Sequence, residues 1–200
     1  MDFKLITFSQ LDATGLKKLV SLHESVLHTL IAELGTPFVE HYYELLSREP
    51  SAVGFCAIAS DGELLGWAVG SPHPDDVNGM LRLPLSWFLP KIFRLVFTKP
   101  SVLWQLIVSL LWSEKQLQSE EDAVELTYFG VASSARGQGI GKALLVAFAD
   151  ATRKAGYRMV TLSAETENAA MLSLTKNLGY RIKSTFKEGK YFRHRLELIL

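Results

Sequence analysis

The stretch VASSARGQGIGK, residues 131–142, decides how the whole chain is interpreted. The apolar residues before it are typical of a strand, and the apolar residues after it, beginning with Leu144 and Leu145, are typical of a helix. The first amides of a helix have no acceptor within it and lie at the positive end of its dipole. Glycine lets a ligand approach the backbone closely. This strand-to-helix turn predicts a cradle for a phosphate or pyrophosphate group, with a tight turn that binds nothing as the alternative.

Two common phosphate-binding motifs do not fit this turn. A P-loop requires a glycine five residues before Gly141, where Arg136 stands, and a Ser or Thr after Lys142, where Ala143 stands. A dinucleotide-binding fingerprint requires its third glycine where Lys142 stands, and it belongs to the first strand–helix unit of a fold. The ligand is therefore expected to be a different phosphate-containing molecule.

Composition places the chain among ordinary globular proteins. It has 200 residues, 48% of them hydrophobic and 21% charged, which excludes a disordered or low-complexity chain. Basic and acidic residues both number 21, so the strong positive charge of a nucleic-acid-binding protein is missing and no nucleic acid partner is expected. The single cysteine, Cys56, excludes an internal disulfide and a cysteine-based metal site, and it is expected to pack in the core.

No targeting or membrane-spanning segment is expected. Residues 1–4 lack the features of a signal peptide. The longest uncharged stretch of the apolar middle, 100–113, is shorter than the ~20 residues that a transmembrane helix needs. We therefore expect a cytoplasmic protein.

Periodicity and turn signals predict one α+β domain over residues 1–200, built around a largely antiparallel sheet. Asp61-Gly62 and Glu188-Gly189 mark hairpin turns. The expected strands are 3–8, 53–60, 63–70, 125–132, 160–164, 180–185 and 191–198, and the expected helices are 9–34, 36–48, 139–155 and 168–178.

Three groups of residues resemble one known family. Arg136-x-x-Gly139-x-Gly141, with an apolar helix behind it, resembles the acetyl-CoA-binding motif of the GNAT (Gcn5-related) N-acetyltransferases. Asn168 at the start of a helix and 178–180, Leu-Gly-Tyr, at its end resemble the family's next motif, and the element order is similar. The resemblance implies a three-layer α/β/α fold with a mixed, mostly antiparallel sheet and CoA bound at the turn between the fourth strand and its helix.

The resemblance also implies a binding site for acetyl-CoA as co-substrate, with no metal. The pyrophosphate would lie on the turn amides, the pantetheine arm would pair along the fourth strand, and a backbone N–H near Val131 would hold the acetyl carbonyl. The cofactor-binding residues expected on this basis are Phe129, Val131, Ser133, Arg136, Gly137, Gln138, Gly139, Ile140, Gly141, Lys142 and Asn168.

Catalytic residues are expected by the same resemblance. Direct transfer needs a neutral amine, and an amine with a pKa of about 10.4 is mostly protonated at pH 7. Glu125 stands where some family members carry the general base; the alternative is a solvated carboxylate at a strand end. Many members place a tyrosine where this chain has Thr175, to protonate the leaving thiolate. Thr175, Tyr180, Tyr191 or a water could act there, and we expect catalytic roles for Glu125, Thr175 and Tyr180.

An insert over 71–124 separates the third and fourth strands and is not explained by the resemblance. Residues 71–76 are expected to form a loop, and the strongly apolar part, 83–112, to contain helices over 85–97 and 101–116. From 79 to 113 there are four basic residues and no acidic one. The helices could pack on the sheet, wall the acceptor pocket, or form a homodimer face or membrane-surface contact.

The resulting functional expectation is an N-acetyltransferase that acts on a primary amine. A loose resemblance of 30–46 to acetyltransferases associated with bacterial cell-surface sugar synthesis favours a small-molecule acceptor such as an amino sugar. A protein N-terminus or lysine side chain is the alternative acceptor. A CoA-binding module with weak catalysis is the alternative from another class.

Overall fold

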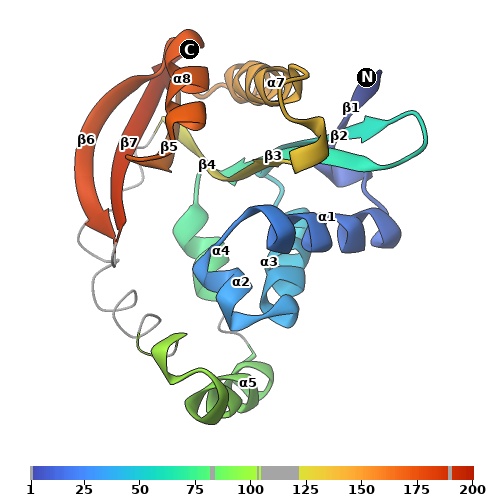
Figure 1. The fold of residues 1–200 in the computed structure, drawn as a ribbon, viewed down its shortest axis with the longest axis vertical. Helices are drawn as coiled ribbons and strands as arrows, with labels where there is room; N and C mark the ends of the chain where they lie inside the picture. The colour runs from blue at the N-terminus through green and yellow to red at the C-terminus, as the bar shows by residue number, and fades with distance from the viewer. Residues whose placement is uncertain (1, 82–83, 103, 105–121, 189–190) are drawn as a thin grey trace.

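A seven-stranded sheet with the strand order β1-β2-β3-β4-β5-β7-β6 organises the chain (Figure 1). The computed structural model describes residues 2–81, 84–102, 104, 122–188 and 191–200. Neighbouring strands run antiparallel except β4 and β5, which are parallel. The strands are β1 (Phe3–Thr7), β2 (Val53–Ala59), β3 (Leu64–Ser71), β4 (Ala123–Val131), β5 (Met159–Glu165), β6 (Arg181–Glu188) and β7 (Tyr191–Ile199).

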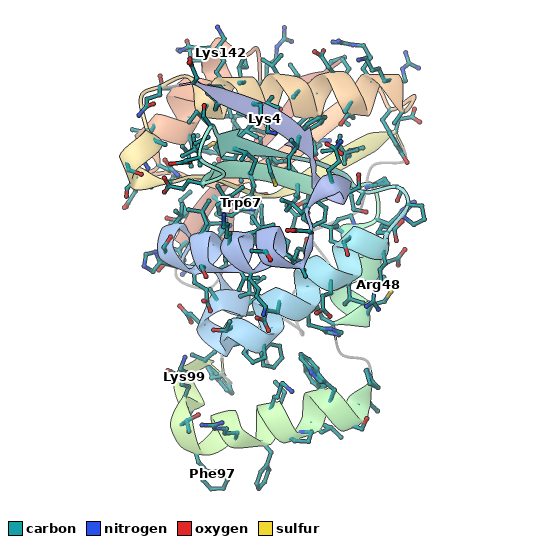
Figure 2. The ribbon with its side chains drawn as sticks, turned by 90° about the vertical axis from the view of Figure 1, so that its right-hand side faces the viewer. Lys4, Arg48, Trp67, Phe97, Lys99 and Lys142 are labelled. Carbon is teal, nitrogen blue, oxygen red and sulfur yellow. The ribbon has the colours of Figure 1, made fainter. Side chains whose placement is uncertain are left out.

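Helices cover both faces of this sheet, which confirms the expected three-layer α+β fold (Figure 1). The 3-10 turns η1 (Phe8–Gln10) and η3 (Ser133–Ala135) follow β1 and β4. On one face lie α1 (Ala13–Val26), α2 (Leu30–Leu34), α3 (Thr36–Arg48) and α4 (Pro74–Met80), and on the other lie α7 (Ile140–Lys154) and α8 (Ala169–Asn177). Helix α5 (Leu85–Thr98) lies beyond the first group, at the end of the molecule opposite α7 (Figures 1 and 2).

Each face of the sheet has its own hydrophobic core. Beneath α7 and α8, Leu65 and Val160 of the sheet pack with Leu144 and Phe148. On the other face, Trp67 of β3 packs with Tyr42 and Tyr43 of α3 in a second cluster, which also holds Leu19 of α1. Cys56 is buried in this second core, as expected. Strand β3 is buried along its whole length and contributes residues to both cores.

Two expected segments were wrong. The helix expected over 9–34 is two helices, because Asp12 caps α1, Leu27 is extended after it, and the Thr29 side chain then caps α2 by accepting from the Ala32 amide. Side chains of this kind compete with the helix for backbone groups. The loop expected over 71–76 gives way to α4 at Pro74, a residue suited to the first helical position.

The apolar insert is described in part. Helix α5 confirms the helix expected over 85–97. Of the helix expected over 101–116, only 101–102 and 104 lie among the described residues, and these are helical. In the described ranges, no helix combines the length and apolar character needed to cross a bilayer.

Candidate active site

The turn between β4 and α7 exposes a row of backbone donors. Gly139 caps α7, and the amides of Ile140, Gly141 and Lys142 have no backbone acceptor in the part of the chain that the structure describes. Gly137 and Gly139 have φ of 77° and 82°, a conformation that favours glycine, and a β-carbon at either would meet nothing within 4 Å. The turn therefore combines unbonded N–H groups, the positive end of a helix and open space, which fits a phosphate group.

Side chains around the turn hold it against the sheet. Ile140 is buried, and Gln138 Nε2 donates to the Ser134 carbonyl at 3.2 Å. A β-carbon on Gly141 would lie 3.3 Å from both Phe129 and Leu174, so the absence of a side chain there lets α7 begin close to β4 and α8. Arg136 and Lys142 are exposed, and Lys142 lies at the α7 end of the molecule (Figure 2).

Next to this turn, one edge of β4 has no strand partner among the described residues, and its Val131 carbonyl accepts from Arg136 Nε at 3.5 Å. β4 and β5 pair only from Ala123 and Met159 to Leu126 and Leu162. At the far end of β4 the Ala132 amide donates to Leu65 of β3 at 2.8 Å. Peptide groups alternate in direction along a strand. Those of Phe129 and Val131 therefore point away from β3, toward the side on which β5 no longer pairs with β4. An extended ligand could pair with this edge as an added strand.

A bulge in β4 lies between this edge and Glu125. Gly70 of β3 pairs with Leu126 and Val69 pairs with Tyr128, so Thr127 is an extra residue on β4. At this point β3 and β4 are so close that a β-carbon on Gly70 would overlap the carbonyl oxygen of Glu125. The bulge and the close approach at Gly70 together determine the position of the Glu125 backbone relative to β3.

The carboxylate of Glu125 is held by an arginine from β7. Arg195 Nη2 lies 2.8 Å from Glu125 Oε2, and the two side chains are 12% and 18% exposed. The same guanidinium donates to Thr161 Oγ1 at 3.1 Å and to Ser163 Oγ at 3.3 Å, both on β5. Glu125 is therefore an oriented, mostly buried carboxylate, which differs from the alternative of a solvated strand end.

Helices α3 and α4 add further groups around Glu125. Burial raises the pKa of Asp75, the charges of Glu125 and Asp76 raise it further, and Arg195 opposes this effect. Burial also raises the pKa of Tyr42, with a smaller contribution from Glu125 in the same direction. Glu125 thus faces the α1–α4 side of the sheet, beside a second carboxylate and a buried tyrosine.

A buried histidine joins the aromatic residues on this face. His23 Nδ1 lies 2.8 Å from the Tyr43 hydroxyl and its Nε2 lies 2.8 Å from Thr29 Oγ1. Its ring contacts Tyr128 of β4 edge to face, with centroids 4.8 Å apart. Burial lowers the pKa of His23 to about 4, so the ring is neutral at pH 7.

The other expected residues, Thr175, Asn168 and Tyr180, lie in α8 and the segments next to it. Thr175 is fully buried, and its hydroxyl lies 2.8 Å from the Met171 carbonyl and 3.1 Å from that of Leu172. Asn168 is exposed and caps α8 by accepting from the Met171 amide at 3.1 Å. Tyr180 is buried, burial raises its pKa, and its hydroxyl has no hydrogen-bond partner among the described residues. The roles expected for these three residues stay predictions.

Sequence reasoning did not identify the partners of Glu125. Asp75 was placed in a loop, and Arg195 was treated as part of an alternating strand. The structure brings the turn, Phe129 and Val131 together at one end of β4, and it brings Glu125, Arg195 and Asp75 together at the other. No group of three or more His, Cys, Asp or Glu residues in the described ranges is arranged to hold a metal ion.

Solved structures of acetyltransferases share this fold at low sequence identity. The ribosomal-protein-alanine N-acetyltransferase from Brucella melitensis is 17% identical, with all of both chains covered and a TM-score of 0.63. The ribosomal-protein-S18-alanine N-acetyltransferase from Escherichia coli is 14% identical over 99% of this chain and 94% of that chain, with a TM-score of 0.62. A GCN5-related N-acetyltransferase from Kribbella flavida is 15% identical over 99% and 98%, also with a TM-score of 0.62.

A family profile identifies the chain more directly. The profile described as the acetyltransferase (GNAT) family matches residues 19–180, from the middle of α1 to just after α8. The chain therefore belongs to the GNAT family of acetyltransferases, acyl-transferring enzymes that use acetyl-CoA. A comparison with curated protein sequences finds no match.

Proposed function

We propose that the protein transfers an acetyl group from acetyl-CoA to a primary amine by direct attack of the amine on the thioester carbonyl. The observation that carries this proposal is the edge of β4 beyond Leu126, which has no strand partner among the described residues, leads to a turn of unbonded amides and follows an oriented carboxylate. One strand thus carries groups suited to holding the acyl donor and a group suited to accepting a proton from the amine.

The turn and the β4 edge would hold the acyl donor. Amides from Gln138 to Lys142 would bind the pyrophosphate, and the exposed Arg136 and Lys142 would add positive charge. Pantetheine would pair along the edge at Phe129 and Val131. A backbone N–H there would stabilise the negative charge that develops on the carbonyl oxygen, because it is already oriented before the reaction.

Glu125 would take the proton from the attacking amine, directly or through a water. Its orientation supports this role, since Arg195, Thr161 and Ser163 leave the carboxylate little freedom. Such a positioned base contributes about 10²–10⁴-fold to rate. Arg195 is a positioning residue in this scheme.

Tyr180 is the better of the two expected donors to the leaving thiolate. The hydroxyl proton of Thr175 is already donated to carbonyls of its own helix, whereas the Tyr180 hydroxyl has no partner among the described residues. The phenol carries its proton at neutral pH, and burial, which raises the pKa of Tyr180, makes it a weaker acid than a free tyrosine. Tyr180 would therefore be present in its donor form.

We propose a small, positively charged amine such as an amino sugar as the acceptor. Glu125 and Asp75 gather negative charge on the α1–α4 side of the sheet, which would attract an ammonium group. A protein N-terminus or lysine side chain carries the same group and is the second candidate. Thiol release from acetyl-CoA, measured with amino sugars, an N-terminal alanine peptide and a lysine peptide, separates these classes by kcat/KM.

The same assay tests whether the protein catalyses the reaction at all. Tight CoA binding without thiol release on any acceptor would support a CoA-binding module, the reading favoured by Thr175 in place of the usual tyrosine. Turnover with at least one amine supports the enzyme. A cytoplasmic location stays a prediction.

A further inference from the structure

Helix α5 has one side packed against the body of the protein. Trp87 and Phe88 contact Phe38 of α3 with ring centroids 5.3 and 6.1 Å apart, and the Trp87 ring lies 4.4 Å from that of His41. Just beyond the helix, Lys99 Nζ donates to the Glu33 carbonyl of α2 at 2.8 Å. These contacts fix which side of α5 faces inward.

The opposite side of α5 carries a stripe of exposed apolar side chains. Leu85, Leu89, Phe93 and Phe97 follow one another at intervals of four residues and are 56%, 57%, 67% and 75% exposed. Residues at this spacing lie on one side of a helix. Phe97 points away from the rest of the molecule, and α5 forms its outer end (Figure 2). Trp104, which follows the helix, is 66% exposed.

The charge around this stripe is positive. The sequence from 77 to 113 contains Arg82, Lys91, Arg94 and Lys99 and no acidic residue, which leaves 17 basic and 21 acidic residues in the rest of the chain. Arg94 is exposed on α5 next to the stripe, whereas Lys91 lies toward the inward side of the helix, with its Nζ 4.1 Å from the Trp87 ring centre. Two copies that met through α5 would bring like charges together, whereas an anionic surface would attract this end of the molecule and repel the remainder.

We propose that α5 docks the protein on the surface of an anionic phospholipid bilayer. The helix would lie in the plane of the membrane, with the stripe of Leu85, Leu89, Phe93 and Phe97 among the upper acyl chains and Arg94 beside the lipid phosphates. Trp104 would lie at headgroup depth, where amphipathic aromatic rings are favoured. The body would then stand away from the bilayer, with the turn at α7 at its far end. This docking does not depend on the proposed function.

Vesicle flotation of the full chain tests this proposal. The vesicles contain phosphatidylcholine alone or with about a third phosphatidylglycerol, at low and high salt. The stripe variant is Leu89→Ser/Phe93→Ser/Phe97→Ser and the charge variant is Arg94→Glu. The matched controls are Ile182→Ser/Ile199→Ser, which removes equally exposed apolar residues from the sheet, and Lys17→Glu, which changes an exposed lysine of α1. Circular dichroism and acetyl-CoA turnover verify that each variant is folded.

We expect binding to the anionic vesicles only, weakened at high salt. The stripe variant should lower the partition coefficient more than tenfold and the charge variant severalfold, with both controls unchanged. Absence of flotation at low salt, or an unchanged partition coefficient in the folded stripe variant, would overturn the proposal. If the wild type does not float, and sedimentation shows that it is a dimer while the stripe variant is a monomer, the proposal is overturned. The stripe would then bind a second copy of the chain.

Discussion

Arg195 on β7 places its Nη2 atom 2.8 Å from the Glu125 carboxylate on β4, and the two strands are separated by β5. The guanidinium crosses β5 by bonding to Thr161 and Ser163 on the way. The orientation of Glu125 therefore depends on three strands, and a change on any of them should alter it.

Replacing the carboxylate should slow the chemical step. For Glu125→Gln, kcat should fall by about 10²–10⁴ while the Kd for CoA stays unchanged, because only the proton acceptor is lost. Glu165→Gln, on the more exposed pair with Arg193, is the matched control and should keep its activity. Steady-state thiol release and calorimetric CoA binding give the two quantities, and a Glu125→Gln enzyme with wild-type kcat would remove Glu125 from the mechanism.

Gly139→Trp should abolish CoA binding without unfolding the protein. The indole would enter the open space over the turn amides, and the positive φ would cost about 1–2 kcal/mol. Gly156→Trp is the matched control, because Gly156 also has a positive φ, of 91°, and open space around it, but lies at the other end of α7. Both variants should lose a few degrees of Tm. Equal CoA affinity in the two would show that the turn does not hold the ligand.

Gly70→Ala should disturb Glu125 through the backbone. A β-carbon there overlaps the Glu125 carbonyl oxygen, so β4 must shift, at a cost of about 1–3 kcal/mol in the free energy of unfolding. The kcat should fall as well, since the carboxylate moves with its strand. Gly62→Ala, in the β2–β3 hairpin, meets no neighbour and reports the effect of the side chain and positive φ alone. Urea denaturation and thiol release measure both effects, and a parallel loss of kcat in the two variants would contradict the explanation.

Tyr180→Phe and Thr175→Val separate the two expected thiolate donors. A thiol with a pKa near 8.5 leaves unprotonated at a cost of roughly 1.4–2.8 kcal/mol at neutral pH, so loss of the true donor should lower kcat about ten- to a hundredfold. We expect this loss in Tyr180→Phe and not in Thr175→Val. The reverse order of kcat values would assign the role to Thr175, and two active variants would leave a water or Tyr191 as the donor.

The free energy of unfolding should decrease at acidic pH because of His23. Its pKa is about 4 when folded and near 6.5 when unfolded, so the unfolded chain binds more protons between these values. Stability is therefore complete above pH 6.5 and is lost as the pH falls toward 4, by about 3 kcal/mol from this residue. His23→Gln should reduce the slope, and the exposed His28→Gln should not. Urea denaturation at several pH values provides the test, and identical slopes in all three proteins would contradict it.

Features with a local cause were predictable from the sequence. The glycine turn was found because an anion cradle at a helix start requires particular residues within a dozen positions, and the hairpin at Asp61-Gly62 was found for a similar reason. The break at Leu27–Thr29 was missed because apolar residues stand on both sides of it, while the side chain of Thr29 determines where α2 begins.

The contacts between residues far apart in the sequence could not be predicted from the sequence. Glu125 and Arg195 are 70 residues apart, and they meet only because β7 inserts between β5 and β6. Asp75 joins them because α4 begins at Pro74, directly after β3. No spacing rule links these three positions, so only the sheet order shows that they belong together.

The bulged strand β4 sets the distance between two groups of the proposed site. Because Phe129, Val131 and Glu125 are carried by one strand of the sheet, the separation between the proposed donor edge and the carboxylate is set by covalent geometry and needs no domain closure. On the other side of Glu125, α3 and α4 bring Tyr42 and Asp75 near the carboxylate. Exchanging α3 and α4 should change which amine is selected and leave the acyl-transfer step unchanged, so these two helices are the segments to redesign for a new acceptor.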